Sequence, residues 1–167
     1  MNLAVDVVIW YLNVINKFMR AALKEAEKAY KLDEVPVGAV IVYDGKIIAR
    51  GHNTREIKQS VLGHAEINAI SKACKKIGSW RLEDCDMYVT LEPCSMCSGA
   101  IIQSRIKNLY FGASDLKTGA AGSVLNLFEY PFNHKVNVVG GILKDECSQI
   151  IKDFFKELRQ KNIDINQ

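Results

Sequence analysis

The sequence predicts an α/β fold, a three-layer α/β/α sandwich around one mixed five-stranded sheet. Three observations support this. A hairpin signal joins two β-patterned segments early in the chain, and helical and strand patterns then alternate to its end. The length of 167 residues is enough for one domain with a substantial core.

Five segments have the strand pattern. The clearest is a hairpin in which residues 37–43 and 46–49 flank the two-residue turn Asp44-Gly45. Pro36 prevents the preceding helix from continuing into it. The other strands are expected at residues 87–91, 108–111 and 136–139.

Four segments have helical periodicity, at residues 17–32, 65–76, 94–105 and 146–161. Gly78 marks the end of the second of these helices. The polar segments 51–63 and 112–122 are expected to be loops. Since long ordered loops in compact domains are often functional, the second loop is a candidate binding element.

The N-terminus is unusually apolar, which divides the chain into an extension of unknown role (residues 1–16) and a single domain (residues 17–167). The extension lacks the basic start and cleavage site of a signal peptide. It is also too short and too polar to span a membrane. We expect it to pack on the domain or on a second subunit, and a start codon assigned too far upstream is the alternative.

The composition is that of a soluble globular protein, with 49% apolar and 25% charged residues. A net charge of +3 argues for nucleic-acid binding only if the basic residues gather on one face. Five cysteines without a secretion signal indicate a reducing compartment, so we expect a cytoplasmic location. Three of them are most simply small buried residues: Cys74, Cys85 and Cys147.

Two short stretches carry chemistry, His-Ala-Glu at residues 64–66 and Pro-Cys-Ser-Met-Cys at residues 93–97. A structural zinc site closes with four protein ligands, whereas a catalytic site keeps one position for water. His64, Cys94 and Cys97 supply three ligands, which is typical of the catalytic kind. The two cysteines are three residues apart at a predicted helix N-terminus, which favours thiolates on one side of the helix.

Glu66 is the carboxylate that the metal does not need. It would take a proton from the activated water and deliver it to the substrate, which is general acid–base catalysis. Because residues two apart in a helix point in nearly opposite directions, His64 must lie just before the first turn if both face one site. The reaction class that fits is hydrolytic attack on an electrophilic carbon with loss of an amine.

The residues leave two other interpretations open. The Cys-x-x-Cys pair could be a redox motif, although that chemistry has no need of an upstream His-x-Glu. A structural zinc site would need a fourth ligand, and none of the candidates has short ligand spacing to the trio. These candidates are His52, His134, Cys74, Cys85 and Cys147.

The combined pattern resembles the zinc-dependent nucleobase and nucleoside deaminases, whose signature is His-x-Glu followed by Pro-Cys-x-x-Cys. Within that cytidine/deoxycytidylate deaminase superfamily, the chain is similar to the bacterial tRNA adenosine deaminases over about residues 17–160. The segments that carry this similarity are 34–40, 90–94, 111–123, 133–136 and 153–159. The resemblance implies a cytidine deaminase-like fold, one Zn²⁺ per subunit, a homodimer and tRNA anticodon stem-loops as substrates. The implied reaction converts adenosine to inosine at the wobble position.

The resemblance also implies roles for individual residues. His64, Cys94 and Cys97 would bind the metal, and Glu66 would be the acid–base group. Further residues would contact the target nucleotide and its neighbours: Asn53, the backbone of Ala65, Asp115, Lys117 and Phe154. Several of these have plainer explanations, namely loop capping for Asn53, solvated loop charge for Asp115 and Lys117, and core packing for at least one of Phe154 and Phe155.

Two rival functions remain. A deaminase of a free base or nucleoside (guanine, cytosine or cytidine) would use the same metal trio, but the loop 111–123 and the terminal helix favour tRNA. A non-catalytic RNA-binding member of the fold would have no use for Glu66. The extension and the loop 55–63 lie outside the family pattern, so the resemblance assigns them no role.

Overall fold

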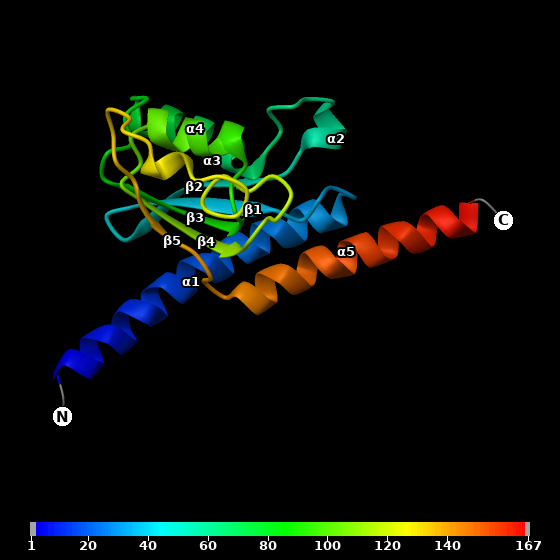
Figure 1. The fold of residues 1–167 in the computed structure, drawn as a ribbon, viewed down its shortest axis with the longest axis horizontal. Coiled ribbons are helices and arrows are strands. Elements are labelled where there is room, and N and C mark those ends of the chain that lie inside the picture. The colour runs from blue at the N-terminus through cyan, green and yellow to red at the C-terminus, as the bar shows by residue number, and fades with distance from the viewer. Residues whose placement is uncertain (1–2, 166–167) are drawn as a thin grey trace.

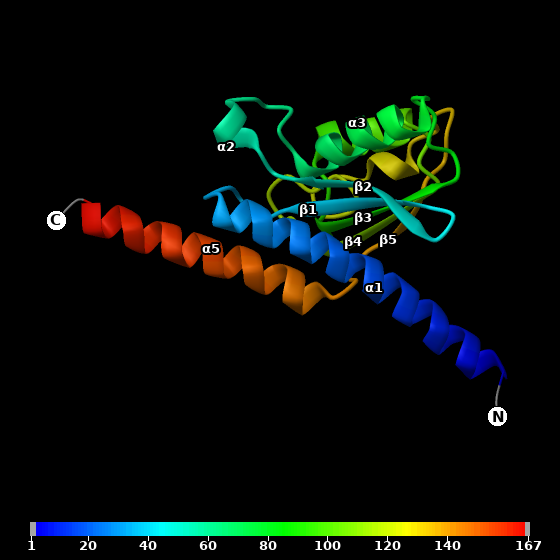
Figure 2. The same ribbon diagram turned by 180° about the vertical axis from the view of Figure 1, so that it is seen from behind.

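A computed structural model describes residues 3–165 and confirms the α/β sandwich with one mixed five-stranded sheet. Helices α1 and α5 cover one face of the sheet, and α3 and α4 cover the other (Figures 1 and 2). The strands are β1 (Gly38–Tyr43), β2 (Lys46–His52), β3 (Cys85–Leu91), β4 (Asn108–Ala113) and β5 (Asn137–Val139). The helices are α1 (Leu3–Lys31), α2 (Arg55–Lys58), α3 (Ala65–Ile77), α4 (Ser95–Gln103) and α5 (Lys144–Ile165).

The sheet has the order β2-β1-β3-β4-β5. β1 pairs antiparallel with both β2 and β3, whereas β3, β4 and β5 run parallel. The predicted hairpin is confirmed. Asp44 and Gly45 both have positive φ, 47° and 68°, as expected for a two-residue turn whose twist matches that of the strands.

Both faces of the sheet are buried, because helices cover each of them. In β1, Ala39 and Ile41 belong to the apolar cluster under α3 and α4, whereas Val40 and Val42 belong to the cluster under α1. β3 and β4 repeat this alternation. Their residues on the α3 and α4 side are Met87, Val89, Leu109 and Phe111, and those on the α1 side are Tyr88 and Tyr110.

Helix α1 is the main departure from the sequence-based prediction. It begins at Leu3 rather than at Lys17, so the predicted domain boundary falls inside one continuous helix. Asp6 and Asn13 are compatible with helix here because both are exposed. The buried stripe of α1 contains Ile15, Met19, Ala22, Ala26 and Ala29.

The first part of α1 extends beyond the sheet (Figures 1 and 2). Seven apolar side chains between Val5 and Leu12 are 47% to 65% exposed. The Tyr11 hydroxyl lies 3.0 Å from that of Tyr110 in β4, which ties the extension to the sheet at one point. The role of the extension stays a prediction. No helix among residues 3–165 is long and apolar enough to cross a membrane.

Smaller boundary differences affect the loops. The segment predicted as a loop from Gly51 begins as the last part of β2, which reaches His52, and it also contains the single turn of α2. Strand β4 extends to Ala113. Helix α5 is longer than predicted at both ends, Lys144–Ile165 instead of 146–161. Helix α2 has no buried residue, so the sequence has no apolar periodicity there that would predict a helix.

Two glycines let helices approach the sheet at backbone distance. A Cβ atom on Gly38 of β1 would overlap the carbonyl oxygen of Ala22 in α1. A Cβ atom on Gly51 of β2 would overlap the carbonyl oxygen of Ala65 in α3. The second contact places the N-terminus of α3 directly against the end of β2.

The strand register explains where a site can form. Gly38, the first residue of β1, pairs with His52, the last residue of β2, and Ala39 pairs with Val89 near the end of β3. The start of β1 and the ends of β2 and β3 therefore lie at one edge of the sheet. Helices α3 and α4 begin at this same edge, which brings the loops after β2 and β3 together.

Candidate active site

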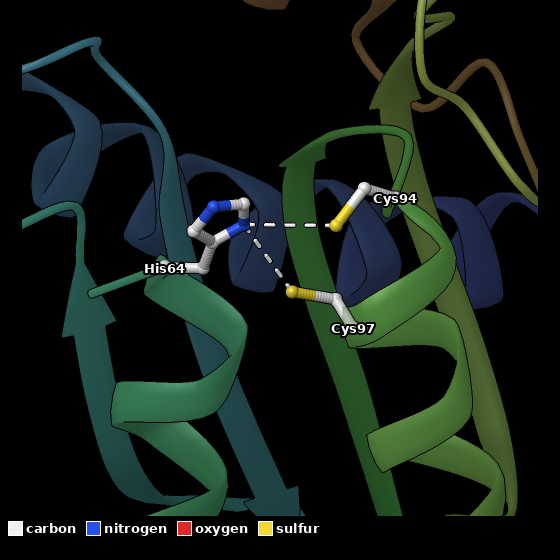
Figure 3. A group of neighbouring side chains, drawn as sticks. All are labelled: His64, Cys94 and Cys97. Atoms are coloured by element: carbon white, nitrogen blue, oxygen red, sulfur yellow. Dashed lines mark hydrogen bonds between the residues drawn. The ribbon is translucent and has the colours of Figure 1, made fainter. Parts of the chain in front are cut away.

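His64, Cys94 and Cys97 converge at this edge. The Nδ1 atom of His64 lies 3.7 Å from the Cys94 sulfur and 3.5 Å from the Cys97 sulfur. Figure 3 shows the imidazole at the start of α3 facing the two thiols at the start of α4. Among the described residues these three form a group whose ligand atoms all lie within 4.8 Å of one another, so it could hold a metal ion.

Two helix N-termini produce this convergence. His64 is the N-cap residue of α3, with an extended backbone (φ −81°, ψ 147°), and Cys94 is the N-cap residue of α4. Cys97 is the third residue of α4, and helical neighbours three apart lie on one face. The expectation that His64 lies just before the first turn is therefore confirmed.

The spacing of the donors fits zinc. Tetrahedral coordination with Zn–S near 2.3 Å and Zn–N near 2.0–2.1 Å requires nitrogen and sulfur to be roughly 3.6 Å apart. The two measured nitrogen–sulfur distances, 3.7 and 3.5 Å, bracket this value. One imidazole and two thiols are also the donor chemistry that zinc prefers.

The two thiols differ in their acidity. Hydrogen bonds from Cys97 and His64 lower the pKa of Cys94 to about 4, despite the opposing effect of burial. The hydrogen bond to Cys94, together with burial, raises the pKa of Cys97. The hydrogen bond to Cys94 also raises the pKa of His64. Cys94 is consequently the more acidic thiol of the pair.

Glu66 is the second residue of α3 and is 4% exposed. Burial raises the pKa of Glu66 to about 7, although its own backbone N–H and the nearby His64 act to lower it. Glu66 and His64 both line a cavity of about 180 Å³. The two residues therefore face one site, as the sequence-based argument required.

Asn53 lies in the same cavity and is 8% exposed. Its Oδ1 atom accepts a hydrogen bond of 3.2 Å from the backbone N–H of Ala65, which is itself fully buried. The side-chain oxygen of Asn53 is thus occupied by the start of α3. No hydrogen bond of its amide nitrogen to another described residue is found, so this end of the side chain can donate into the cavity.

Asp115 and Lys117 differ in their relation to the cavity. Asp115 lines the cavity, and its carboxylate accepts hydrogen bonds from the backbone N–H groups of Lys117 and Thr118 and from the Thr118 hydroxyl. Burial would raise the pKa of Asp115, but these hydrogen bonds lower it overall. Lys117 is exposed and is not among the residues that line the cavity. Asp115 therefore has at least a structural role in the loop.

Glu92 is a buried carboxylate to which the sequence analysis gave no role. It is 2% exposed, lines the cavity, and accepts hydrogen bonds from the backbone N–H groups of Asp115 (3.0 Å), Ala121 (3.0 Å) and Ser123 (2.9 Å). It also accepts one from the Ser123 hydroxyl. The sequence offered a signal, because Glu92 stands two residues before the candidate ligand Cys94 and belongs to the segment 90–94, which carries the family similarity.

The loop that Glu92 organises also contacts the metal-ligand segment. Its Ala120 N–H donates to the carbonyl oxygen of Pro93 at 2.9 Å, and Gly119 forms a β-bridge with Cys94. The long loop after β4, predicted to be functional, is thus fixed beside the candidate metal centre.

Glu34 and two residues of α2 also line the cavity. Glu34 is 1% exposed, and its Oε1 atom accepts a 2.8 Å hydrogen bond from the backbone N–H of Ile57. Arg55 and Glu56 also line the cavity, although the sequence analysis assigned no role to residues 55–63. The only signal for Glu34 was its place in the segment 34–40.

Phe154 is not brought to this site. It is 6% exposed and packs edge to face against Tyr30 of α1, with ring centroids 5.5 Å apart. It is absent from the residues that line the cavity. The contact that the structure shows for Phe154 is therefore with α1, and its role towards RNA stays a prediction. Its neighbour Phe155 is 39% exposed and has more surface to offer a partner.

Comparisons with known proteins show the family of this chain. Residues 14–159 match the MafB19-like deaminase family. The tRNA-specific adenosine deaminase of Bacillus subtilis (strain 168) is 51% identical over 145 residues, which cover 86% of this chain and 90% of that protein.

Two solved structures extend the comparison. One comes from biochemical and structural studies of A-to-I editing by tRNA:A34 deaminases at the wobble position of transfer RNA. It has a TM-score of 0.78 and 46% identity, and the match covers 80% of this chain and 98% of that one. A guanine deaminase from Bacillus subtilis is a more distant match, with a TM-score of 0.56 and 31% identity over 70% of this chain and 85% of that one. On this similarity in sequence and fold, the chain belongs to the deaminase family that includes the tRNA-specific adenosine deaminases.

Proposed function

We propose that this protein converts adenosine to inosine at the wobble position of tRNA anticodons by hydrolytic deamination. One observation carries the chemical part of the proposal. His64, Cys94 and Cys97 form a cluster of three zinc-type donors, and His64 and Cys94 line the same cavity as the buried Glu66 and Asn53. The donor set fits a catalytic zinc site, because three protein ligands leave one position for water.

His64, Cys94 and Cys97 would hold a zinc ion, which would lower the pKa of the attacking water towards neutrality. Glu66 would accept a proton from the attacking water and later donate a proton to the departing amine, which leaves as ammonia. The exchange consumes one water for each amine released. Glu66 can serve in both directions because it lies in the site without being needed as a metal ligand.

The residues around the cavity would hold the target base. The Asn53 amide nitrogen is placed to donate a hydrogen bond to the nucleotide. The Ala65 N–H, currently bonded to Asn53, would contribute if the two separate on binding. Asp115 lies on the loop side of the cavity, and Lys117, exposed nearby, would contact the neighbouring RNA.

The choice of tRNA as substrate is supported by similarity. The Bacillus relative and the A34 deaminase structure are 51% and 46% identical to this chain, whereas the guanine deaminase structure from Bacillus subtilis is 31% identical. A homodimer and a cytoplasmic location are part of the same proposal. The second is supported by the five cysteines, none of which forms a disulfide within the described residues.

The proposal is tested by incubating the zinc-loaded protein with total bacterial tRNA and sequencing the product, in which inosine reads as guanosine. We expect conversion at the anticodon wobble adenosine. Ammonia release from free guanine or cytidine without conversion of tRNA would establish the free-base function instead. Zinc content is measured on the same sample, so that an inactive preparation is distinguished from a wrong substrate.

A further inference from the structure

The stretch that carries Asn53 is fixed by a side chain outside the cavity. The amide nitrogen of Asn68, in α3, donates one hydrogen bond to the carbonyl oxygen of His52 at 2.9 Å and another to the Thr54 hydroxyl at 3.1 Å. These two acceptors stand immediately before and immediately after Asn53. We infer that Asn68 is a positioning residue that sets where Asn53 presents its amide to the substrate, an inference that rests on the proposed function.

The position of Asn68 on α3 makes this coupling direct. Its backbone N–H donates to the carbonyl oxygen of His64 at 3.0 Å, in the first turn of the helix. The same residue thus contacts the metal-ligand residue through its backbone and both flanks of Asn53 through its side chain. A change in the distance between α3 and the end of β2 would move Asn53 relative to His64 and Glu66.

Other contacts restrain the same stretch and define what Asn68 adds. The N–H of Asn53 donates to the carbonyl oxygen of Val37 at 3.1 Å, and the His52 ring lies 3.2 Å from the Glu25 carboxylate. These contacts attach the stretch to the residue before β1 and to α1. Asn68 attaches it to α3, the helix that follows His64 and carries Glu66. This contact fixes the position of Asn53 relative to His64 and Glu66.

Asn68 is half-buried, so replacing it leaves the two apolar cores intact. A positioning group that shifts by about 1 Å can change the rate by roughly 100-fold. Loss of the Asn68 side chain should therefore reduce catalysis more than it reduces folding stability.

Lys72 offers a matched control on the same helix. Its ammonium donates to the carbonyl oxygen of Arg50 in β2 at 2.8 Å, so it also bridges α3 to β2. That acceptor lies two residues before His52 and does not flank Asn53. A purely structural link between helix and strand would be weakened by Lys72→Ala as well as by Asn68→Ala.

The test compares Asn68→Ala, Lys72→Ala, Asn53→Ala and the Asn53→Ala/Asn68→Ala double variant, all zinc-loaded, on an anticodon stem-loop. We expect Asn68→Ala to keep one zinc per chain and to lose about 10-fold or more in kcat/KM. Lys72→Ala should stay within about 2-fold of the wild type, and Asn68→Ala should have little further effect once Asn53 is absent. Independent losses that multiply in the double variant, or an Asn68→Ala enzyme as active as the wild type, would overturn the inference.

A second readout does not depend on the substrate. The Ala65 N–H is bonded to the Asn53 side chain, so its hydrogen exchange reports the position of Asn53. We expect faster exchange at Ala65 in Asn68→Ala and unchanged exchange in Lys72→Ala. Unchanged exchange in both variants would overturn the inference. A wild-type protein that leaves the stem-loop unchanged, with this exchange pattern intact, would instead count against the proposed function alone.

Discussion

The Glu92 carboxylate accepts a hydrogen bond of 2.9 Å from the backbone N–H of Ser123, 31 residues further along the chain. This contact spans the loop after β4 and holds its far end beside the strand that leads to Cys94. Hydrogen bonds from Asp115 and Ala121 to the same carboxylate fix the rest of the loop. One buried glutamate therefore gives the loop its shape.

Replacing Glu92 with glutamine should lower the free energy of unfolding by about 2 kcal/mol, because a charged acceptor of several backbone N–H groups becomes a neutral amide. Urea denaturation of the zinc-loaded protein measures this, with the exposed residue Glu83 changed to glutamine as the control. Equal stability of the two variants would show that the loop holds its shape without the Glu92 charge.

The same carboxylate predicts a pH dependence. Burial alone would raise the pKa of Glu92, but its hydrogen bonds hold it below the ordinary value of 4.5. Its ionisation therefore stabilises the fold fully above that ordinary pKa, and this contribution is lost as the pH falls through the lower folded pKa. The stability difference between wild type and Glu92→Gln, measured by denaturation at several acidic pH values, should shrink as the pH falls. A constant difference would contradict the assignment.

Glu66→Gln should retain one zinc per chain and lose about 100-fold to 10,000-fold in turnover, because the metal ligands are intact and the proton carrier is absent. Zinc analysis and single-turnover deamination of an anticodon stem-loop measure the two effects separately. Glu83→Gln serves as the matched control. Turnover close to that of the wild type would remove Glu66 from the acid–base role.

Cys94→Ala should fail to retain zinc, since two protein ligands remain of three. Cys74→Ala is the matched control, because Cys74 is a half-buried free cysteine that is not part of the ligand group. The zinc content of both variants after dialysis against a weak chelator decides the matter. A Cys94→Ala protein that still holds one zinc per chain would mean that the ligand set is wrong.

How much the sequence could predict depended on whether the determinants were local. The hairpin at Asp44-Gly45 and the placement of His64 before the first turn of α3 follow from neighbouring residues, and both are confirmed. Glu92 was missed because its partners lie 23 to 31 residues away and are known only once the loop folds back.

Helical periodicity left other questions undecided. It could not tell whether Phe154 faces a groove or another helix, and the answer depends on how α5 packs against Tyr30. The start of α1 was misplaced for a related reason. On the N-terminal side of Ile15 the helix extends past the sheet, and no pattern of buried residues there reveals its periodicity.

The glycine at the start of β1 gives the last prediction. Gly38→Ala should destabilise the fold by about 3 kcal/mol, because the added methyl group would overlap backbone atoms of α1 at Ala22 and Ala26, which cannot rotate away. Gly99→Ala is the matched control in α4, where an added Cβ meets no atom within 4 Å. That variant should be unchanged or more stable by roughly 0.5–1 kcal/mol, since alanine favours helix over glycine. Denaturant unfolding of both proteins tests the close approach of α1 to the sheet, and a Gly38→Ala protein as stable as Gly99→Ala would show that this approach is looser than the structure describes.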